Sequence, residues 1–595
     1  MSEGTSTDRS TGTTIGPGTT SPTDAASPTY ADSLTDANSP TDTTSSTGAD
    51  SPTDTIAPTG TIAPTGTIAP TYATSPTDTT SPTDLLTALF DTADRRGAAP
   101  ALTGPDARTL TYAQLARAVL ATAHRLRQAG LAREDRVLFS VRPGPDGVVL
   151  ALGVIAAGGT VVFADPGAGP ELFAARRELA APRWAAAESL LYAVARYGRP
   201  LARRRGLLLP PYHRLGLRHI YAGRRLPGVP AGALSARRLA AGPVPAVRPH
   251  ADPGQEALVV FTSGTTRAPK AVVHTRGSLG AGLAGCGPAL GMAAGDTLHT
   301  DQLMMGVPAL IAGAHWTMPP YGFAPAADPA RFARGLTGAT HAFCVPADLP
   351  AVVEAVERGE AAFPATLRHL VLGGAPVLPG LLRRAQRALP SVDFLAVYGM
   401  TEMVPVAIAT GRQKLDHTGP GDLLGTPLPA ITLRTAPDGE LLVSGPNLCR
   451  GYLGEPPMHE HATGDLARLE DGQLILLGRK KDMLIRGRTN IYPGLYEPSV
   501  TALPGVAEAV IVGVPDPYGD ERVILTLVPD GTTPTDTLTA SVRSRLPTLI
   551  DTAALPDEIV VLDRIPVTGR TRKPDREALR TRLRDRVAPH PTEAP

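Results

Sequence analysis

The chain is poor in cysteine and in long apolar runs, and each shortage excludes a class of protein. Its three cysteines are odd in number and widely spaced, which argues against a disulfide framework and favours a reducing compartment. No stretch reaches the ~18 to 20 apolar residues of a membrane span. The first residues lack the basic and apolar segments of a secretory signal. The sequence therefore predicts a cytoplasmic protein without stable membrane insertion.

Lysine is scarce as well, because only five of the 57 basic residues are lysine. Four of the five lie in three short segments: FTSGTTRAPK (261–270), GRKKD (478–482) and PVTGRTRKPDR (566–576). Arginine does not replace lysine where a compact ammonium must reach a phosphate or a developing oxyanion. The distribution indicates sites of that kind, and the alternative is chance.

Residues 1–84 consist almost wholly of Thr, Ser, Pro, Ala, Gly and Asp, with recurring Ser-Pro-Thr and a repeated Ile-Ala-Pro-Thr-Gly-Thr. Such a segment has too little apolar surface to offset its chain entropy, so we expect a disordered tail. The tail carries a charge of −9, which leaves about +10 on the rest of the chain. The arginine-rich stretch 172–248 predicts either a solvated basic surface or one that attracts acidic acyl-carrier partners. No nucleic-acid module is present, so we expect no nucleic-acid partner.

The remaining sequence predicts an α/β protein with two domains. Apolar residues recur at helical spacing in 85–96 and 112–130, and strand-like runs follow at 136–141, 257–262, 369–372 and 393–397. This alternation indicates a large layered α/β domain over 85–478. Residues 479–590 predict a small α+β domain. Its expected strands are 505–514, 521–528 and 558–562, and its expected helices are 536–546, with Asp536 as N-cap, and 576–584.

The segment FTSGTTRAPK follows a strand-like run and resembles a phosphate-binding turn. Its hydroxyls and exposed backbone N–H groups form a nest suited to phosphate, and Lys270 adds a positive charge. It is not a Walker motif, because Ala271 follows the lysine where that motif has Ser or Thr. The alternative is an ordinary polar turn.

Two further glycine-containing turns follow strand-like runs, at Gly373–Pro376 and Tyr398–Glu402. Ligands of layered α/β sheets collect beyond the carboxyl ends of strands, so these turns are expected to meet at one nucleotide. Thr401 could donate to a phosphate oxygen, and Glu402 could bind Mg²⁺. Taken alone, Glu402 is better explained as a carboxylate at a helix start.

The segment Thr463–Leu466 places Asp465 beside a glycine, where its carboxylate could accept hydrogen bonds from both ribose hydroxyls. By itself the segment is better explained as a plain turn.

The order of these motifs, together with the stretch GRKKDMLIRGRTNIYP and a late lysine at position 573, resembles the adenylate-forming superfamily. That superfamily includes acyl-CoA synthetases, the adenylation domains of peptide synthetases and firefly luciferase. The resemblance spans roughly residues 85–585 and implies a large AMP-binding domain followed by a small mobile domain. GRKKDMLIRGRTNIYPGLYEP is similar to acyl-CoA synthetases. Other stretches, such as YGMTEMVPVA, look closest to the β-lactone synthetases of olefin biosynthesis.

The resemblance implies ATP and Mg²⁺ as co-substrate and metal, and a role for each motif. Lys573 would stabilise the charge that develops as a carboxylate attacks the α-phosphate, Thr401 would contact that phosphate, and Glu402 would bind Mg²⁺. Lys481 would be the hinge about which the small domain turns between half-reactions. The residues that would hold the nucleotide are Thr262, Ser263, Gly264, Thr265, Thr266 and Lys270 around the phosphates, Gly373, Gly374, Ala375 and Tyr398 at adenine, and Asp465 and Arg479 at ribose.

Four departures from the family pattern concern the phosphate loop, the late lysine and the acyl pocket. Arg267 and Ala271 stand where the phosphate loop of the family usually has glycine, and Arg572 replaces the glycine that usually precedes the late lysine. In the stretch 301–315, the usual aromatic or His lining of the acyl pocket is missing, and Met304, Met305, Gly306 and Val307 lie there instead.

Together these features predict an acyl-adenylate-forming ligase that activates an aliphatic or fatty carboxylic acid and passes it to CoA or a carrier thiol. One alternative is a β-lactone synthetase that acts on a β-hydroxy acid without CoA. The alternative from another class is a degenerate, non-catalytic binding or scaffold protein, which Arg267 favours and which Lys270, Glu402, Asp465 and Lys573 oppose.

Overall fold

The computed structural model describes residues 72–73, 84–166, 170–204, 209–243, 247–261, 270–486, 489–515, 521–568 and 572–587. The expected disordered tail therefore lies outside the described residues, except at Tyr72–Ala73 and Asp84. Asp84 does not belong to a tail, because it is 3% exposed and caps the first helix. Its carboxylate accepts the backbone N–H of Thr87 at 2.9 Å and pairs at 2.7 Å with Arg276, which is also buried.

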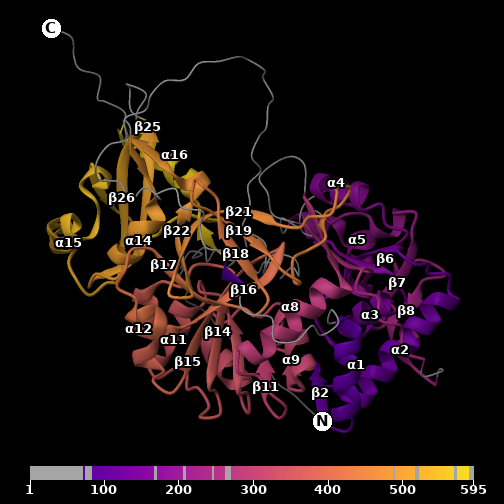
Figure 1. Ribbon diagram of the computed structural model, residues 1–595. Helices are drawn as coiled ribbons and strands as arrows, with labels where there is room; N and C mark the ends of the chain where they lie inside the picture. The colour runs from indigo at the N-terminus through magenta and orange to yellow at the C-terminus, as the bar shows by residue number, and fades with distance from the viewer. Residues whose placement is uncertain are drawn as a thin grey trace, which may run out of the picture.

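The larger part of the chain builds two sheets with a layer of helices between them (Figure 1). The first sheet, among the described residues, runs in the order β1 (Tyr72–Ala73), β18 (Thr432–Thr435), β19 (Glu440–Ser444), β21 (His461–Glu470), β22 (Gln473–Arg479), β17 (Asp422–Pro427), β16 (Met403–Thr410), β15 (Asp393–Met400), β14 (His369–Gly373), β13 (His341–Cys344), β11 (Thr297–His299), β12 (His315–Thr317), β2 (Pro100–Thr103) and β3 (Thr109–Thr111). The second runs in the order β20 (Gly451–Tyr452), β10 (Ala271–Thr275), β9 (Glu256–Phe261), β5 (Thr160–Phe163), β4 (Arg136–Ser140), β6 (Trp184–Glu188), β7 (Arg218–Ala222) and β8 (Leu234–Ser235).

Helices cover both faces of the first sheet. The helices of this domain are α1 (Leu85–Arg96), α2 (Tyr112–Gln128), α3 (Pro145–Ala156), α4 (Pro170–Ala180), α5 (Ser189–Tyr197), α6 (Arg199–Arg204), α7 (Ala236–Ala240), α8 (Arg276–Ala289), α9 (Leu303–Ala312), α10 (Pro329–Gly335), α11 (Leu349–Glu357), α12 (Pro379–Ala388) and α13 (Gly411–Asp416), with a short 3-10 turn at Tyr212–Arg214. On β14, Leu370 and Leu372 pack with α11 and α12, whereas Val371 packs with α8 and α9. This alternation follows from the two-residue period of a strand.

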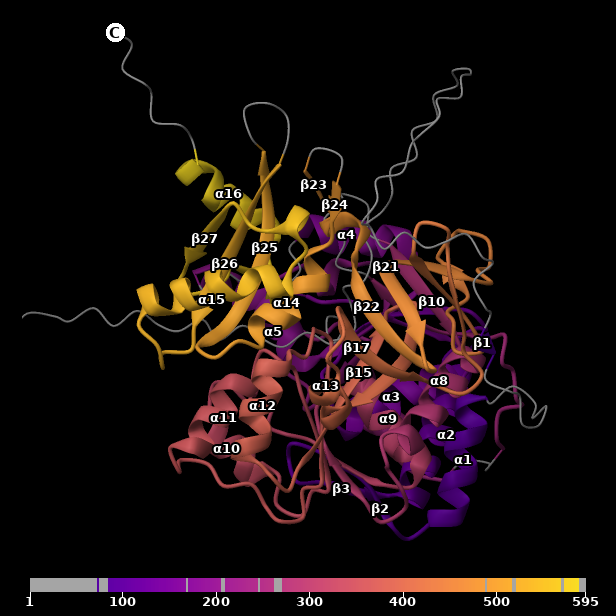
Figure 2. The same cartoon turned by 60° about the vertical axis from the view of Figure 1, so that its left-hand side comes forward.

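The small domain follows β22 and has a core of its own (Figure 2). Its elements are η3 (Lys480–Asp482), β23 (Leu484–Arg486), β24 (Thr489–Ile491), α14 (Pro493–Thr501), β25 (Val506–Pro515), β26 (Glu521–Pro529), α15 (Thr535–Leu549), η4 (Thr552–Ala554), β27 (Glu558–Val561), β28 (Val567–Thr568), β29 (Lys573–Pro574) and α16 (Arg576–Val587). Helices α14 and α15 pack on one face of the β25–β26–β27 sheet, and α16 packs on the other. The α/β architecture with a large and a small domain is as expected, while the boundary at 478–479 stays a prediction.

The local predictions for the small domain agree with the structure except at the helix cap. The expected strands 505–514, 521–528 and 558–562 correspond to β25, β26 and β27. Asp536 is not the N-cap of α15, because the helix begins one residue earlier and Pro534 holds the cap position. Asp536 instead lies in the first turn, where a carboxylate favours the positive end of the helix.

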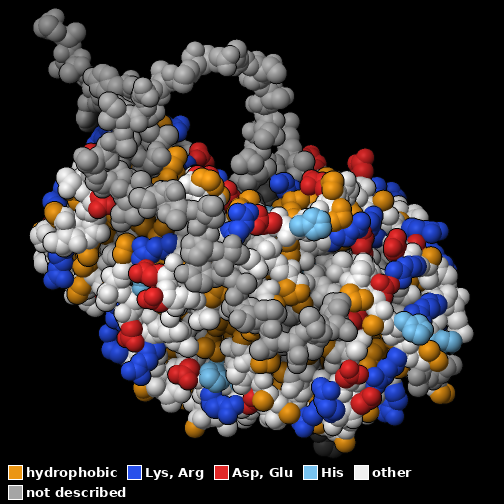
Figure 3. All heavy atoms as spheres, viewed as in Figure 1, with side chains coloured by type: hydrophobic (Ala, Val, Ile, Leu, Met, Phe, Trp, Pro, Cys, Tyr) orange, Lys and Arg blue, Asp and Glu red, His pale blue; other side chains and the backbone are white. Residues whose placement is uncertain are grey.

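The arginines of 172–248 do not all lie on the surface. Arg176 is 6% exposed and lies over the ring of Phe261, at 5.3 Å from its centroid, whereas Arg224 and Arg237 are exposed. On the face in Figure 3, basic and acidic side chains are interspersed. Within the described residues, no helix is both long and apolar enough to cross a membrane.

Candidate active site

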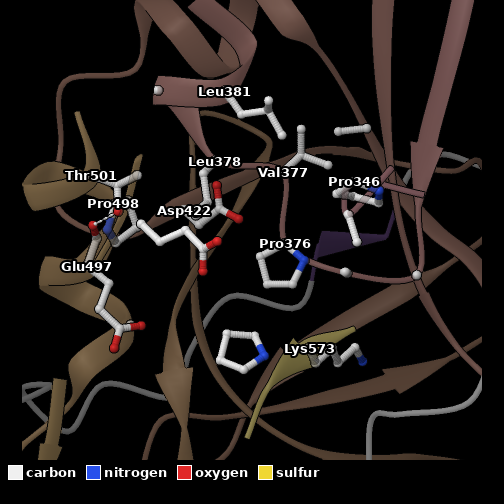
Figure 4. Close-up of a pocket in the computed structure, with 18 of the residues that line it drawn as sticks. Pro346, Pro376, Val377, Leu378, Leu381, Asp422, Glu497, Pro498, Thr501 and Lys573 are labelled. Atoms are coloured by element: carbon white, nitrogen blue, oxygen red, sulfur yellow. Dashed lines mark hydrogen bonds between the residues drawn. The ribbon is translucent and has the colours of Figure 1, made fainter. Parts of the chain in front are cut away.

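A cavity of about 1310 Å³ lies where the small domain meets the large one (Figure 4). It brings together predicted site residues that are up to 200 positions apart in the sequence. Those that line it are Gly373, Gly374, Ala375, Tyr398, Asp465, Arg479, Lys481 and Lys573.

Two neighbouring strands place their turns on one side of this cavity. Strands β14 and β15 are parallel, and Gly373 pairs with Val397 in their register. Their carboxyl ends therefore open at the same edge of the sheet, which is where ligands of α/β folds bind. Gly374 has a φ of +83°, so the turn after β14 needs the conformational freedom of glycine.

Tyr398 and Asp465 are joined at the wall of the cavity. The hydroxyl of Tyr398 donates to Oδ2 of Asp465 at 2.7 Å, and the carboxylate is fully buried. Burial and the neighbouring Asp465 raise the pKa of Tyr398 well above its usual value, so the phenol keeps its proton. Arg479 Nε lies 2.7 Å from Oδ1 of Asp465 as an ion partner, yet that oxygen accepts no hydrogen bond from the described residues. Oδ1 is thus an acceptor that a ligand hydroxyl could use.

The segment Thr463–Asp465 is not a plain turn, because it lies within strand β21. Asp465 pairs with Arg479 across β21 and β22, which explains how a charged residue comes to lie beside the buried carboxylate. The backbone N–H of Gly464 donates to Glu440 at 2.8 Å, and Lys480 donates to the same carboxylate at 2.6 Å. The contacts that Gly464 and Lys480 make with Glu440 therefore hold in place the strand that carries Asp465.

Thr401 and Glu402 form the turn between the antiparallel strands β15 and β16, so Glu402 is not at a helix start. Both are buried, at 3% and 1% exposed. His274 Nε2 lies 2.7 Å from the carbonyl of Thr401, and since a carbonyl only accepts, that nitrogen carries the proton. Burial lowers the pKa of His274, which keeps the ring neutral.

Tyr452 connects Glu402 with Lys270. Its hydroxyl donates to Oε1 of Glu402 at 2.8 Å, and the Nζ of Lys270 lies 4.9 Å from the centroid of its ring. This tyrosine was not found by sequence reasoning, because it lies outside the recognised motifs and meets Glu402 only through the pairing of β20 with β10. Thr262, Ser263, Gly264, Thr265, Thr266 and Arg267 lie outside the described residues.

The carboxylate of Glu402 fits a Mg²⁺ ion that shares its ligands with phosphate. Tyr452 occupies Oε1, while Oε2 has no hydrogen-bond partner among the described residues. Within the same residues, no cluster of three or more His, Cys, Asp or Glu side chains could hold a metal by itself. A single carboxylate with phosphate oxygens and water is an ordinary coordination set for Mg²⁺.

Lys573 reaches the cavity on the short β28–β29 hairpin, below Pro376 in the view of Figure 4. The residue before it, Arg572, has a φ of +52°, which explains why the family usually has glycine there. Just beyond it, Arg576 binds both carboxylate oxygens of Glu497 at 2.7 Å. These contacts raise the pKa of Arg576 despite its burial. The start of α16 is therefore fixed to α14, and the hairpin is fixed with it.

Lys481, the predicted hinge, is exposed in the 3-10 turn between the last strand of the large domain and the first of the small one. A different lysine lies deep in the cavity wall. Lys414 on α13 is 4% exposed and donates to Asp422 and, at 2.7 Å, to the carbonyl of Leu423. Sequence reasoning left Lys414 unassigned, because its partner follows it by eight residues across an irregular connection.

The other end of the cavity, which we call the acyl end, is formed by Cys286, Gln302, Met304, Met305 and Phe343. Cys286 comes from α8, and burial raises the pKa of its thiol to about 12. Gly306 does not line this space, because a Cβ there would meet the ring of Trp316 at 2.1 Å. The two methionines take the place of the aromatic or His lining that the sequence lacks.

Two protein-family models match this chain. The family model described as AMP-binding enzyme matches residues 89–453, and that described as AMP-binding enzyme C-terminal domain matches residues 496–573. Among curated proteins, an isonitrile lipopeptide synthase of Streptomyces coeruleorubidus is 30% identical over 532 residues. The match covers 83% of this chain but only 33% of that much longer relative.

Two other similar proteins match along nearly their whole length. A feruloyl-CoA synthase of Amycolatopsis is 31% identical over 495 residues, which cover 77% of this chain and 91% of that one. Among solved structures, the amide bond synthetase McbA from Marinactinospora thermotolerans superimposes with a TM-score of 0.67 at 24% identity. That superposition covers 84% of this chain and 99% of the other, and at this identity it speaks for the fold alone.

Proposed function

The chain belongs to the AMP-binding enzyme family and is an acyl-adenylate-forming ligase; on that premise we propose that it activates an apolar carboxylic acid and transfers it to a thiol. In the first half-reaction the carboxylate attacks the α-phosphate of ATP and releases pyrophosphate. In the second, the thiol of CoA or of a carrier protein attacks the acyl-AMP. The observation that carries the proposal is the single cavity lined by the turn after β14, by Tyr398, Asp465 and Arg479, and by Lys573.

The nucleotide would lie against the wall that the large domain provides. Asp465 Oδ1, which is buried and has no hydrogen-bond donor among the described residues, would accept from the ribose hydroxyls. The ring of Tyr398 would pack on adenine beside the Gly373–Ala375 turn, since all of them line the same space. Tyr398 is held in place by its hydrogen bond to Asp465, so both groups are ordered before the nucleotide arrives.

The phosphates would lie toward Thr401, Glu402 and Lys270. When bound, Mg²⁺ neutralises charge on the phosphate oxygens, and Glu402 would hold it through Oε2. Lys270 would bring a positive charge to the same region, with its ammonium positioned over the ring of Tyr452. His274 fixes the carbonyl of Thr401, and the turn held in this way would present Thr401 to the α-phosphate.

Lys573 would act at the reacting atoms. Lys573 lines the cavity from the small domain, so its position depends on how that domain is docked. A cation there would stabilise the negative charge that grows on the α-phosphate and carboxylate oxygens during attack. Rotation of the small domain about Lys481 would then withdraw Lys573 and admit the thiol.

The acid would be one with an uncharged, mainly apolar tail. The five residues of the acyl end carry no charge, so a second carboxylate or an ammonium on the acid would be left unpaired there. An aliphatic acid, as the sequence predicts, and an aromatic acid, such as the name of the feruloyl-CoA synthase indicates for that relative, both fit such a lining. The name of the feruloyl-CoA synthase also supports a thiol acceptor.

The test is ATP–pyrophosphate exchange with Mg²⁺ over a panel of aliphatic, β-hydroxy, aromatic, dicarboxylic and amino acids, followed by product analysis with and without CoA. We expect exchange that depends on one class of uncharged-tailed acid, and a thioester once CoA is added. A β-lactone formed without CoA would contradict the thiol acceptor. The absence of exchange with every acid would contradict adenylation and favour a non-catalytic binding protein.

A further inference from the structure

The acyl end of the cavity holds one polar amide among apolar side chains. Met304 and Met305 come from the first turn of α9, and Phe343 comes from β13. Met305, Phe343 and Cys286 pack with Val397, the residue before Tyr398, so this end adjoins the nucleotide wall. Gln302 lines the same space and is 9% exposed.

Neighbouring residues fix the backbone of Gln302. It holds the N-cap position of α9, and its side chain does not cap that helix. Its backbone N–H donates to the hydroxyl of Thr300 at 3.0 Å, and its carbonyl accepts from Gly306 at 2.8 Å. The side chain therefore starts from a rigid position, as a group that selects a substrate must.

The side-chain amide of Gln302 has a defined orientation. Its Nε2 donates to Oδ1 of Asp301 at 2.7 Å. A carboxylate only accepts, so the amide nitrogen rather than the oxygen must face Asp301. The oxygen Oε1 is then turned away from Asp301, and no hydrogen bond to it is formed by the described residues. Because Gln302 lines the cavity, Oε1 is an acceptor that a hydroxyl group of a bound acid could use.

We propose that Gln302 is a specificity-determining residue whose Oε1 accepts a hydrogen bond from a hydroxyl group on the acid that this enzyme activates. The preferred acid then has an uncharged apolar tail and carries one hydroxyl that reaches the start of α9. This inference rests on the proposed adenylation and narrows its substrate class. The carboxylate of Asp301 acts indirectly, as a positioning group that holds the amide in one orientation.

A site that offers an acceptor discriminates against the analogue that lacks the donor, because the acceptor is then left unpaired. The expected discrimination is that of one hydrogen bond between neutral groups. We therefore expect a hydroxylated acid to have a kcat/KM about tenfold above that of its matched analogue, which corresponds to about 1.4 kcal/mol.

The experiment measures acid-dependent pyrophosphate exchange for two matched pairs, 3-hydroxyoctanoate with octanoate and 4-hydroxycinnamate with cinnamate. The variant Gln302→Met keeps the length of the side chain but removes the acceptor. It should abolish the preference within the favoured pair, because kcat/KM for the hydroxylated acid falls further than kcat/KM for the unhydroxylated acid. Gln386→Met, on α12, changes an amide outside the cavity and should keep the full preference.

Asp301→Asn gives a second variant, which reduces the preference because an amide at position 301 no longer dictates which atom of Gln302 faces it. The inference is overturned if neither hydroxylated acid is preferred, or if Gln302→Met preserves the ratio. Exchange without discrimination would refute only the role of Gln302. The lack of exchange with any acid would refute the proposed adenylation together with it.

Discussion

The change Tyr398→Phe tests the assignment of the nucleotide wall, because it removes one hydroxyl and keeps the aromatic ring. The lost bond is the 2.7 Å donation to Asp465, whose carboxylate is fully buried. A hydrogen bond to a charged group contributes about 1.5–3 kcal/mol, and water does not replace the donor in so closed a place. We expect the free energy of unfolding of the large domain to fall by an amount in that range.

The same change should weaken ATP binding. Asp465 would keep Arg479 as its ion partner but lose the group that fixes Oδ2, so its oxygens would no longer be aligned for the ribose. Since a loss of about 1.4 kcal/mol corresponds to a factor of ten, we expect the KM for ATP to rise about tenfold or more. The retained ring should still pack on adenine, so the variant keeps measurable turnover.

The chain offers a matched control in Tyr496→Phe. Tyr496 donates to Oδ2 of Asp551, also at 2.7 Å, but this pair lies in the small domain and Asp551 is exposed. Water can replace the hydroxyl there, so we expect a loss of stability of about 1 kcal/mol at most and no change in the KM for ATP. The assays are pyrophosphate exchange at varied ATP and denaturant unfolding. Equal KM values for the two variants would refute the role given to Tyr398 and Asp465.

Three further outcomes follow from the contacts. Lys414→Met leaves Asp422 buried without its cation and should destabilise the large domain by about 3–5 kcal/mol in urea unfolding, whereas Arg412→Met on the exposed side of α13 should change it little. Tyr452→Phe removes the donor that orients Glu402, so titration of the exchange reaction should require about tenfold more Mg²⁺. Burial lowers the pKa of His299 and His341 from 6.5 to about 4, so the stability that depends on their neutral form is complete above pH 6.5 and is lost as the pH falls through 4. Melting temperatures measured from pH 7 to pH 4 should therefore decline, and a constant melting temperature would contradict this.

Much of the fold could be predicted from local patterns. The runs before the GGAP and YGMTE turns are strands β14 and β15, and the three strands of the small domain lie within two residues of their expected bounds. These predictions work because the side-chain period of an element is a property of neighbouring residues. The assignment of Asp536 as a helix cap was wrong. The side-chain period does not fix the first residue of a helix, which depends on small differences in backbone geometry.

The contacts that build the candidate site could not be read in the same way. A turn was the natural interpretation of Thr463–Asp465, but long-range pairing with β19 and β22 makes that segment part of a strand. Tyr452 donates to Glu402, which lies 50 residues away in the sequence. The role proposed for Gln302 depends on its side-chain oxygen Oε1, which accepts no hydrogen bond from the described residues. Such facts depend on tertiary packing, which single-sequence patterns do not contain. The arginine at position 572, by contrast, is recognisable in the sequence as a departure from the usual glycine. The positive φ of Arg572 in the structure explains why glycine is usual there.

The central claim is that this chain forms an acyl-adenylate with Lys573 at the reacting atoms. Its most direct test is acid-dependent ATP–pyrophosphate exchange in the wild type, in Lys573→Ala, and in Arg564→Ala, which removes an exposed cation of the small domain outside the cavity. We predict exchange that requires the acid in the wild type, retention in Arg564→Ala, and a loss of at least a hundredfold in Lys573→Ala with an unchanged melting temperature. Exchange that needs no acid, or that survives in Lys573→Ala, would contradict the account.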